Sequence, residues 1–371
     1  MLMCLAILGS VSIVTPYLHL FWTYSCTARN LKFYSLALRR AFDNEPSLAH
    51  VAAHFRIRLC TGQEKLFAEC DTWELLNLAP DEAVSLTTRI SETFGLSTPA
   101  LQAVLNNYLV QTTGKDDLEK YFGIDQTPQY LCPKTTHYSW PKGAGELCIS
   151  ASEPLEMKAH LAPKAITGIG STNMIRVPVD EQARIDCQAL DTLLADCVKY
   201  RQAVYAVVVI MGTTEHGSVD PLSKILALRR KYQQHGLSFL IHADAAWGGY
   251  FASMLVPNPG LTGSESHLDD PTLFVNAHTV NELRHLRHAD SVTLDPHKSG
   301  YTPYPAGALC YQDGRLRYMV TWNSPVIGFE DESLKMGVYG IEGRYVLVPY
   351  ATPRLLSADI SFSSANQVQH L

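Results

Sequence analysis

The chain has 371 residues, 46% of them hydrophobic and 18% charged, so it can bury a sizeable core as one large domain with a smaller attachment, or as two domains. Its formal net charge of -6 offers no basic surface and excludes a nucleic-acid partner. The nine cysteines are an odd number without C-x-x-C pairs or metal-finger spacing, which predicts reduced thiols in a cytoplasmic protein and no metal site.

The first 28 residues contain no Lys, Arg, Asp or Glu. Since about 20 apolar residues can span a bilayer, a membrane anchor is one interpretation of this segment. Pro16 and His19 interrupt the apolar stretch, however, and no basic residues precede it as they would in a signal peptide. This pattern favours a buried segment over an anchor.

The next part of the chain is expected to be mostly helical. Apolar residues recur at helical spacing over 30–42, which predicts an amphipathic helix. Further helices are predicted over 56–77 and over 80–110, where Asp81 after a proline is a start signal. The polar stretch 114–123 reads as a loop. We expect these elements to form a structural scaffold, because none of them contains a catalytic motif.

From residue 129 onward, strands and helices alternate. The run 203–211 is almost entirely β-branched and apolar, as is typical of a strand covered on both faces. The expected strands are 129–132, 174–179, 203–211, 237–244 and 291–294. The expected helices are 189–199, 222–235 and 279–288. This alternation predicts an α/β fold with a parallel sheet and helices on its faces.

One motif follows the last of these strands, where the chain reads D-P-H-K-S-G-Y from Asp295 to Tyr301. Pro296 removes a backbone donor and ends the strand, so Lys298 stands at a strand end, where α/β folds place their chemistry. A lysine there serves in a structural ion pair or as a nucleophilic amine whose pKa is lowered by burial. The motif alone leaves both interpretations open.

A second motif, H-A-D-A-A-W-G-G, contains Asp244 at the end of the preceding strand. An aspartate at the end of a buried strand needs a partner to remain ionised, and the small residues after it suit a flat ring lying against the backbone. A carboxylate that can hold a pyridinium nitrogen, together with a lysine that can form an aldimine, is the protein signature for pyridoxal phosphate.

Two further blocks, H-Y-S-W-P-K from His137 and G-T-T-E-H-G from Gly212, precede these motifs. With these four blocks in order, the sequence resembles the pyridoxal-phosphate-dependent group II amino-acid decarboxylases, in particular the tyrosine decarboxylase-like enzymes of the fungal type. The resemblance runs in patches over about 28–343. It implies a three-layer, fold-type I transferase-like large domain with a mostly parallel sheet, and a homodimer. It also implies decarboxylation of an L-amino acid, of aromatic type.

The resemblance assigns three catalytic residues. Lys298 would carry pyridoxal 5'-phosphate as an aldimine and exchange it for the amino-acid substrate. Asp244 would pair with the ring nitrogen and keep it protonated, while His137 would stack on the ring. Trp247 and the tyrosines after Lys298 are candidate walls of the substrate pocket.

Four more residues are implied to contact the cofactor. Ala246 would leave room beneath the ring, and His297 and Asp295 would flank the lysine and orient cofactor or substrate. Thr214 would lie near the phenolic oxygen of the ring, although a threonine after a strand also commonly caps the following helix. Both interpretations of Thr214 stay open.

The resemblance also divides the chain into an apolar segment (1–28), a cofactor-binding large domain (29–330) and a remnant of a small C-terminal domain (331–371). The family's phosphate-binding loop would fall at 18–26, which has no glycine here, and an insertion is expected near 145–164. The fold is therefore expected to be truncated at both ends. These departures support an alternative, namely a catalytically impaired pseudoenzyme or a fragment of such a decarboxylase.

Overall fold

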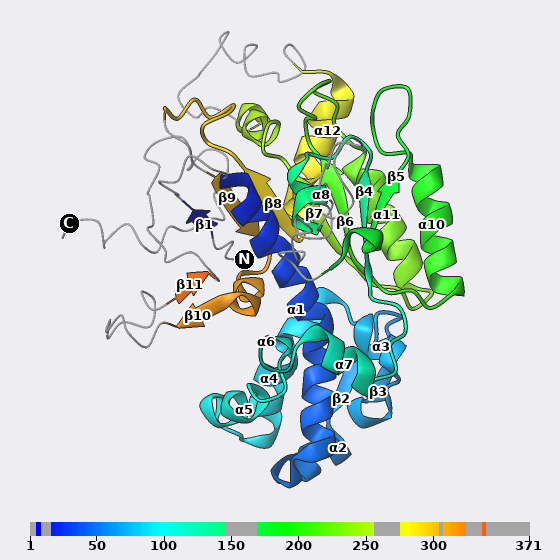
Figure 1. Cartoon of the computed structure of the whole chain (residues 1–371), viewed down its shortest axis with the longest axis vertical. Helices are drawn as coiled ribbons and strands as arrows, with labels where there is room; N and C mark the ends of the chain where they lie inside the picture. The colour runs from blue at the N-terminus through cyan, green and yellow to red at the C-terminus, as the bar shows by residue number, and fades with distance from the viewer. Residues whose placement is uncertain are drawn as a thin grey trace, which may run out of the picture.

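The computed structural model describes residues 5–8, 16–144, 169–255, 275–303, 307–323 and 336–338. They form an α/β body around a seven-stranded sheet and, below it in Figure 1, a mostly helical body. Helix α1 (Pro16–Asn44) runs through both bodies. It crosses residue 28 without a break, and the division of the chain at residues 28 and 330 stays a prediction.

The central sheet is mostly parallel, as expected. Its strand order is β1-β9-β8-β7-β6-β4-β5. The strands are β1 (Leu5–Leu8), β4 (Gln129–Pro133), β5 (Met174–Val177), β6 (Val204–Ile210), β7 (Leu240–Asp244), β8 (Ser291–Leu294) and β9 (Gly307–Tyr311). The five strands from β5 to β8 in this order pair in parallel, whereas β9 is antiparallel to both β8 and β1.

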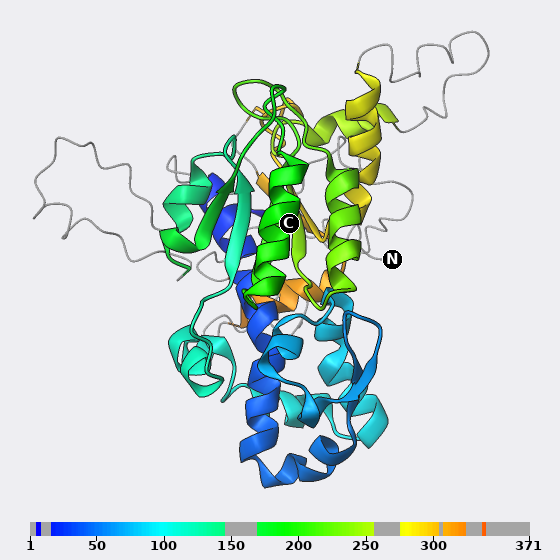
Figure 2. The same cartoon turned by 90° about the vertical axis from the view of Figure 1, so that its right-hand side faces the viewer.

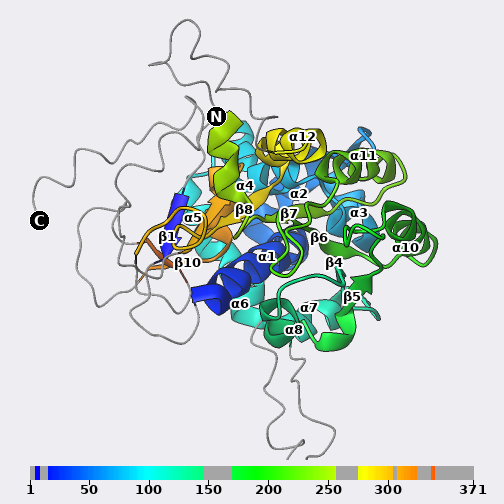
Figure 3. The ribbon, with the colours of Figure 1, turned by 90° about the horizontal axis from the view of Figure 1, so that it is seen from above.

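Helices cover both faces of the sheet, which confirms the three-layer arrangement (Figures 2 and 3). Strand β6 is buried along its whole length, and its side chains alternate between the faces. Val208 and Ile210 pack in the core that contains α1, whereas Val207 and Val209 pack in the core on the other face. That other face carries α10 (Cys187–Lys199), α11 (Leu222–Gln233) and α12 (Ala277–His285).

The helical body surrounds the second half of α1. Its elements are α2 (Ala49–His54), β2 (Arg56–Arg58), β3 (Glu64–Leu66), α3 (Thr72–Leu76), α4 (Pro80–Phe94), α5 (Thr98–Leu105), α6 (Val110–Thr113) and α7 (Lys115–Tyr121). Phe42 of α1 makes edge contacts with the rings of Phe55 and Phe67, with ring centres 6.4 and 5.3 Å apart. These aromatic contacts fix the hairpin region against the helix.

The helix predicted over 56–77 is wrong. This stretch forms the antiparallel hairpin β2–β3, and only its last part is helical, as α3. The chain reverses near Gly62, whose φ of 89° is unfavourable for residues with a side chain. Each hairpin strand has three residues, which is too short for an alternating pattern to be recognised.

Two other expectations in this body need correction. The helix predicted over 80–110 is interrupted, because Gly95 adopts a left-handed conformation (φ 68°) that ends α4, and α5 follows it. The loop predicted at 114–123 is mostly the helix α7. That helix buries Leu118 and is otherwise polar, so it lacks the apolar stripe by which a helix is recognised.

Helix α1 is longer than the predicted 30–42. It begins at Pro16, a position in the first turn that suits proline because its missing N–H has no partner there. The stretch 18–26, where the resemblance implies a phosphate-binding loop, is therefore helical. Among the described helices, none combines the length and apolarity that crossing a bilayer requires. The insertion expected at 145–164 and most of 331–371 lie outside the described residues.

Candidate active site

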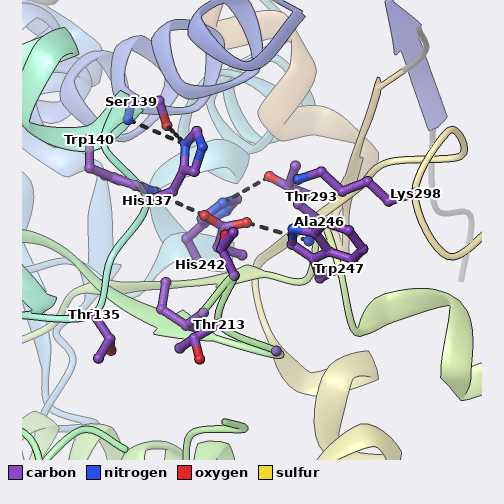
Figure 4. Close-up of a pocket in the computed structure, with 14 residues that line it drawn as sticks. Thr135, His137, Ser139, Trp140, Thr213, His242, Ala246, Trp247, Thr293 and Lys298 are labelled. Carbon is purple, nitrogen blue, oxygen red and sulfur yellow. Dashed lines mark hydrogen bonds between the residues drawn. The ribbon is translucent and has the colours of Figure 1, made fainter. Parts of the chain in front are cut away.

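The carboxyl ends of β4, β6, β7 and β8 meet at one edge of the sheet, and the segments after them surround a cavity (Figure 4). The cavity has a volume of about 40 Å³ and is partly open to solvent. Open α/β sheets bind their ligands at this edge. Asp244 from the end of β7 and Lys298 from the segment after β8 both line it. The two sequence motifs therefore meet in one site.

Lys298 forms an ion pair with Asp295, with 3.0 Å between Nζ and the carboxylate oxygen Oδ2. The side chains are 9% and 1% exposed, respectively. Burial raises the pKa of the Asp295 carboxyl, and the charge of Lys298 opposes that rise. The amine also lies 5.1 Å from the ring centre of Trp247. Of the two interpretations of this lysine, the ion pair is present, and the same amine faces the cavity.

Asp244 accepts two hydrogen bonds. The indole Nε1–H of Trp140, in α8 (Ser139–Ala144), donates to Oδ2 at 3.1 Å, and the backbone N–H of Ala246 donates to Oδ1 at 3.4 Å. The sequence block that contains Trp140 was recognisable as a motif, whereas this contact was not predictable from it. Trp140 lies seven residues after the last residue of β4, and this spacing does not indicate which strand its N–H reaches.

His242 lies two residues before Asp244 on the same strand and was not predicted as a site residue. Its Nδ1 is 2.8 Å from Ser291 Oγ, and its Nε2 is 3.0 Å from Thr293 Oγ1. The ring of Tyr24 stacks on the His242 ring with centres 4.0 Å apart. Burial lowers the pKa of His242 to about 4, so this imidazole is neutral near pH 7.

His137, expected to stack on a cofactor ring, lines the cavity. Its Nδ1 lies 2.8 Å from the hydroxyl oxygen of Ser139, which fixes the orientation of the imidazole. Its ring also lies 4.0 Å from the ring of Tyr138. Ala246, the small residue expected beneath the ring, is buried and lines the same cavity.

The remaining predicted residues differ in their placement. Thr214 lines the cavity and does not cap α11, whose N-cap position is Pro221 without a side-chain hydrogen bond. Its neighbour Thr213 instead accepts the backbone N–H groups of His216 and Ser218 and so holds the turn. His297 is outside the lining but close enough for its charge to lower the pKa of Asp295.

The expected pocket walls are found in part. Trp247 lines the cavity and is 42% exposed. Tyr301, the first tyrosine after the lysine, has a left-handed backbone conformation (φ 54°), is 91% exposed and does not line the cavity. The second tyrosine of that stretch lies outside the described residues.

Two glycines let the loops after β6 and β7 approach each other at the cavity. Gly212 has φ 105°, a conformation that residues with a side chain rarely adopt. A Cβ atom on Gly248 would lie 2.0 Å from the carbonyl oxygen of Met211, so only glycine fits. This close backbone contact sets the distance between the two loops that carry Thr214 and Trp247.

The family model described as the pyridoxal-dependent decarboxylase conserved domain matches residues 123–263, a range that contains His137 and Asp244 and ends before Lys298. The L-tyrosine decarboxylase of Enterococcus faecium is 30% identical over 284 residues, covering 73% of this chain and 40% of that protein. The L-tyrosine decarboxylase of Levilactobacillus brevis is 28% identical over 292 residues, covering 75% and 41%.

A second substrate type also occurs among the similar proteins. The L-2,4-diaminobutyrate decarboxylase of Acinetobacter baumannii is 31% identical over 156 residues, covering 42% of this chain and 25% of that protein. The chain thus spans about 40% of the length of the tyrosine decarboxylases that it matches, and less of this one.

Proposed function

The chain belongs to the family of pyridoxal-phosphate-dependent group II amino-acid decarboxylases, and we propose that it binds pyridoxal 5'-phosphate in this cavity and removes the α-carboxylate of an L-amino acid as carbon dioxide. One observation carries the proposal. The carboxylate of Asp244 and the amine of Lys298, which are far apart in the sequence, line one cavity at the carboxyl edge of the sheet. Assignment to the fungal type of the family stays a prediction.

The residues of the cavity fit the ring of this cofactor by their chemistry. An amine is present for its aldehyde, a carboxylate for its ring nitrogen, and a small residue, Ala246, beside them. When bound, pyridoxal phosphate supplies an electron-accepting ring that stabilises the negative charge left on the substrate when carbon dioxide departs.

The protein's own groups would then do the following. Lys298 would hold the cofactor. Asp295, whose carboxylate lies 3.0 Å from the amine, would position that amine and could accept a proton from it. Asp244, held by Trp140 and the backbone of Ala246, would keep the ring nitrogen protonated. His137 would pack on the ring, and Thr214 would offer its hydroxyl to an oxygen of the cofactor.

The substrate is proposed to be aromatic. Trp247 gives the cavity an aromatic wall, and two of the similar proteins are tyrosine decarboxylases. This is tested by incubating the protein with tyrosine, tryptophan, aspartate and 2,4-diaminobutyrate in turn. The carbon dioxide and the hydrogen peroxide released are both measured for each substrate. Carbon dioxide from an aromatic substrate is the expected result. Peroxide formation would instead identify an oxidative reaction that yields an aldehyde.

A catalytically impaired protein is the second candidate function. The observation that favours it is the helical conformation of 18–26, where the family resemblance implies the loop that binds the cofactor phosphate. A helix interior uses its N–H groups in its own hydrogen bonds and leaves none for a phosphate. A protein of this kind would bind the cofactor weakly or not at all.

We also propose a homodimer in a reducing, cytoplasmic environment. Three large apolar side chains near the cavity are substantially exposed, namely Trp247 (42%), Phe251 (47%) and Tyr301 (91%), and a second subunit would cover them. All seven cysteines in the described residues are free thiols. Light scattering after size-exclusion chromatography tests the dimer, and a monomeric mass would refute it.

The test of the cofactor proposal is a titration of the purified protein with pyridoxal phosphate, followed by borohydride reduction and peptide mass spectrometry. We expect a new absorption band in the wild-type protein and a pyridoxyl group on Lys298. Lys298→Ala should show neither, whereas Lys134→Ala, which removes an exposed lysine near the site, should match the wild type. Absence of the band in the wild type at high cofactor concentration would refute the decarboxylase and support the impaired protein.

A further inference from the structure

The ring that donates to the Asp244 carboxylate is one of three buried aromatic rings that contact one another and come from three separate elements. These are Tyr24 of α1, Trp140 of α8 and His242 of β7, and each is at most 2% exposed. The ring of Trp140 lies 5.5 Å from that of His242 and 6.0 Å from that of Tyr24. The indole thus packs against a histidine and a tyrosine whose rings stack on each other. Figure 4 shows Trp140 and His242 on the same side of the cavity.

The indole makes one directional contact with the carboxylate. Its Nε1–H can only donate a hydrogen bond, and it donates to Asp244 Oδ2 at 3.1 Å. The contact fixes the rotation of the carboxylate, so that its remaining lone pairs keep one direction in the cavity.

His242 supplies no positive charge to this carboxylate near pH 7. Both of its ring nitrogens are engaged by the hydroxyl groups of Ser291 and Thr293, and burial keeps the ring neutral. A protonated imidazole two residues from Asp244 would compete with any other cation for the carboxylate. A neutral, clamped imidazole supports the indole by packing and adds no positive charge.

We propose that Trp140 is a positioning residue whose indole N–H holds the Asp244 carboxylate in the orientation needed to keep a proton on the ring nitrogen of the cofactor. The inference rests on the proposed function. His242 and Tyr24 act one step further away, because they fix the plane of the indole. If Trp140 only filled the core, its rings would matter and its N–H would not.

The test therefore removes the N–H and keeps a buried ring. In Trp140→Phe, or with benzothienylalanine at position 140, which retains two fused rings, the carboxylate loses the indole donor and keeps the longer hydrogen bond from the backbone N–H of Ala246. The control is Trp73→Phe in α3, which lines none of the cavity. Two quantities are measured: the dissociation constant of pyridoxal phosphate, and the pH midpoint at which the absorption spectrum of the bound cofactor reports loss of the ring proton.

We expect weakening of cofactor binding by about tenfold or more, since hydrogen bonds to charged groups are among the stronger ones, and a pH midpoint lowered by about one unit. The urea midpoint of the benzothienyl protein should stay near the wild-type value, and Trp73→Phe should keep both cofactor quantities. Unchanged binding and an unchanged pH midpoint in the benzothienyl protein would overturn the inference while leaving the decarboxylase intact. A wild-type protein that binds no cofactor would refute the proposed function itself, and this inference with it.

Discussion

Lys32 of α1 is a buried lysine whose charge should make the stability of the protein depend on pH. It is 6% exposed, and its Nζ donates to the carbonyl oxygens of Leu76 at 2.7 Å and Ser238 at 2.5 Å. It thereby ties α1 to the end of α3 and to the chain just before β7. Burial lowers the pKa of the amine from 10.5 to about 7. The change to examine is Lys32→Met, which keeps the length of the side chain and removes the amine.

The sign and size of the effect follow from proton linkage. Between pH 7 and 10.5 the unfolded chain holds a proton on this amine that the folded protein lacks, so the free energy of unfolding rises with pH over that window and falls as pH drops back toward 7. At ~1.36 kcal/mol per pH unit, the gain between about pH 7.5 and about pH 9.5 is about 2 kcal/mol. Lys32→Met lacks this gain, but it leaves two carbonyl groups without their donor, at about 1–3 kcal/mol each.

Urea denaturation at both pH values measures the difference directly, because other titrating groups contribute equally to wild type and variant. We expect wild-type stability to rise relative to that of Lys32→Met by about 2 kcal/mol between the two pH values. Lys224→Met, which changes an exposed lysine of α11, serves as the control and should follow the wild type. If Lys32→Met and wild type respond equally to pH, the amine is not desolvated and the reasoning is wrong.

Two further substitutions test packing and charge, both by urea denaturation. Gly248→Ala should lower the free energy of unfolding by about 1–3 kcal/mol because its Cβ would lie 2.0 Å from the carbonyl oxygen of Met211. The control Gly217→Ala has open space around its Cβ at φ 63° and should lower it by about 1 kcal/mol. Equal losses in the two variants would contradict the steric argument. Arg229→Met should lose about 3–5 kcal/mol of stability because buried Asp290 would lose its cationic partner, although it would keep the hydrogen bond from the Ile241 N–H at 2.6 Å. Adding Asp290→Asn should restore part of that loss, and no restoration would show that the charge is not the cause.

The strands of the sheet could be predicted because their sequences carry a strong local signal. The strand predicted at 291–294 has the bounds of β8, and the run 203–211 contains β6. Both are apolar and β-branched stretches of a length that suits a buried strand. The order β8-β7-β6-β4 and the antiparallel placement of β9 depend on contacts across the sheet, which no local pattern contains.

The site could be predicted where its residues stand in compact motifs. Asp244 and Lys298 each follow a recognisable strand, and the structure places both at one cavity. The roles of Tyr24 and His242 could not be predicted, because a stacked ring pair between α1 and β7 has no counterpart in the spacing of either segment. Trp140 was in a motif that was recognised, but its hydrogen bond reaches across to another strand.

The parallel sheet has a consequence for how the site comes into existence during folding. Its pairs join distant residues, such as Gln129 with Val204 and Ala243 with Val292, and each requires closure of a long loop before any contact is gained. Lys298 follows β8, which is the last of the parallel strands along the chain. The cavity therefore assembles only once the whole central sheet has formed, and the binding of a ligand there reports completion of folding rather than the presence of any one segment.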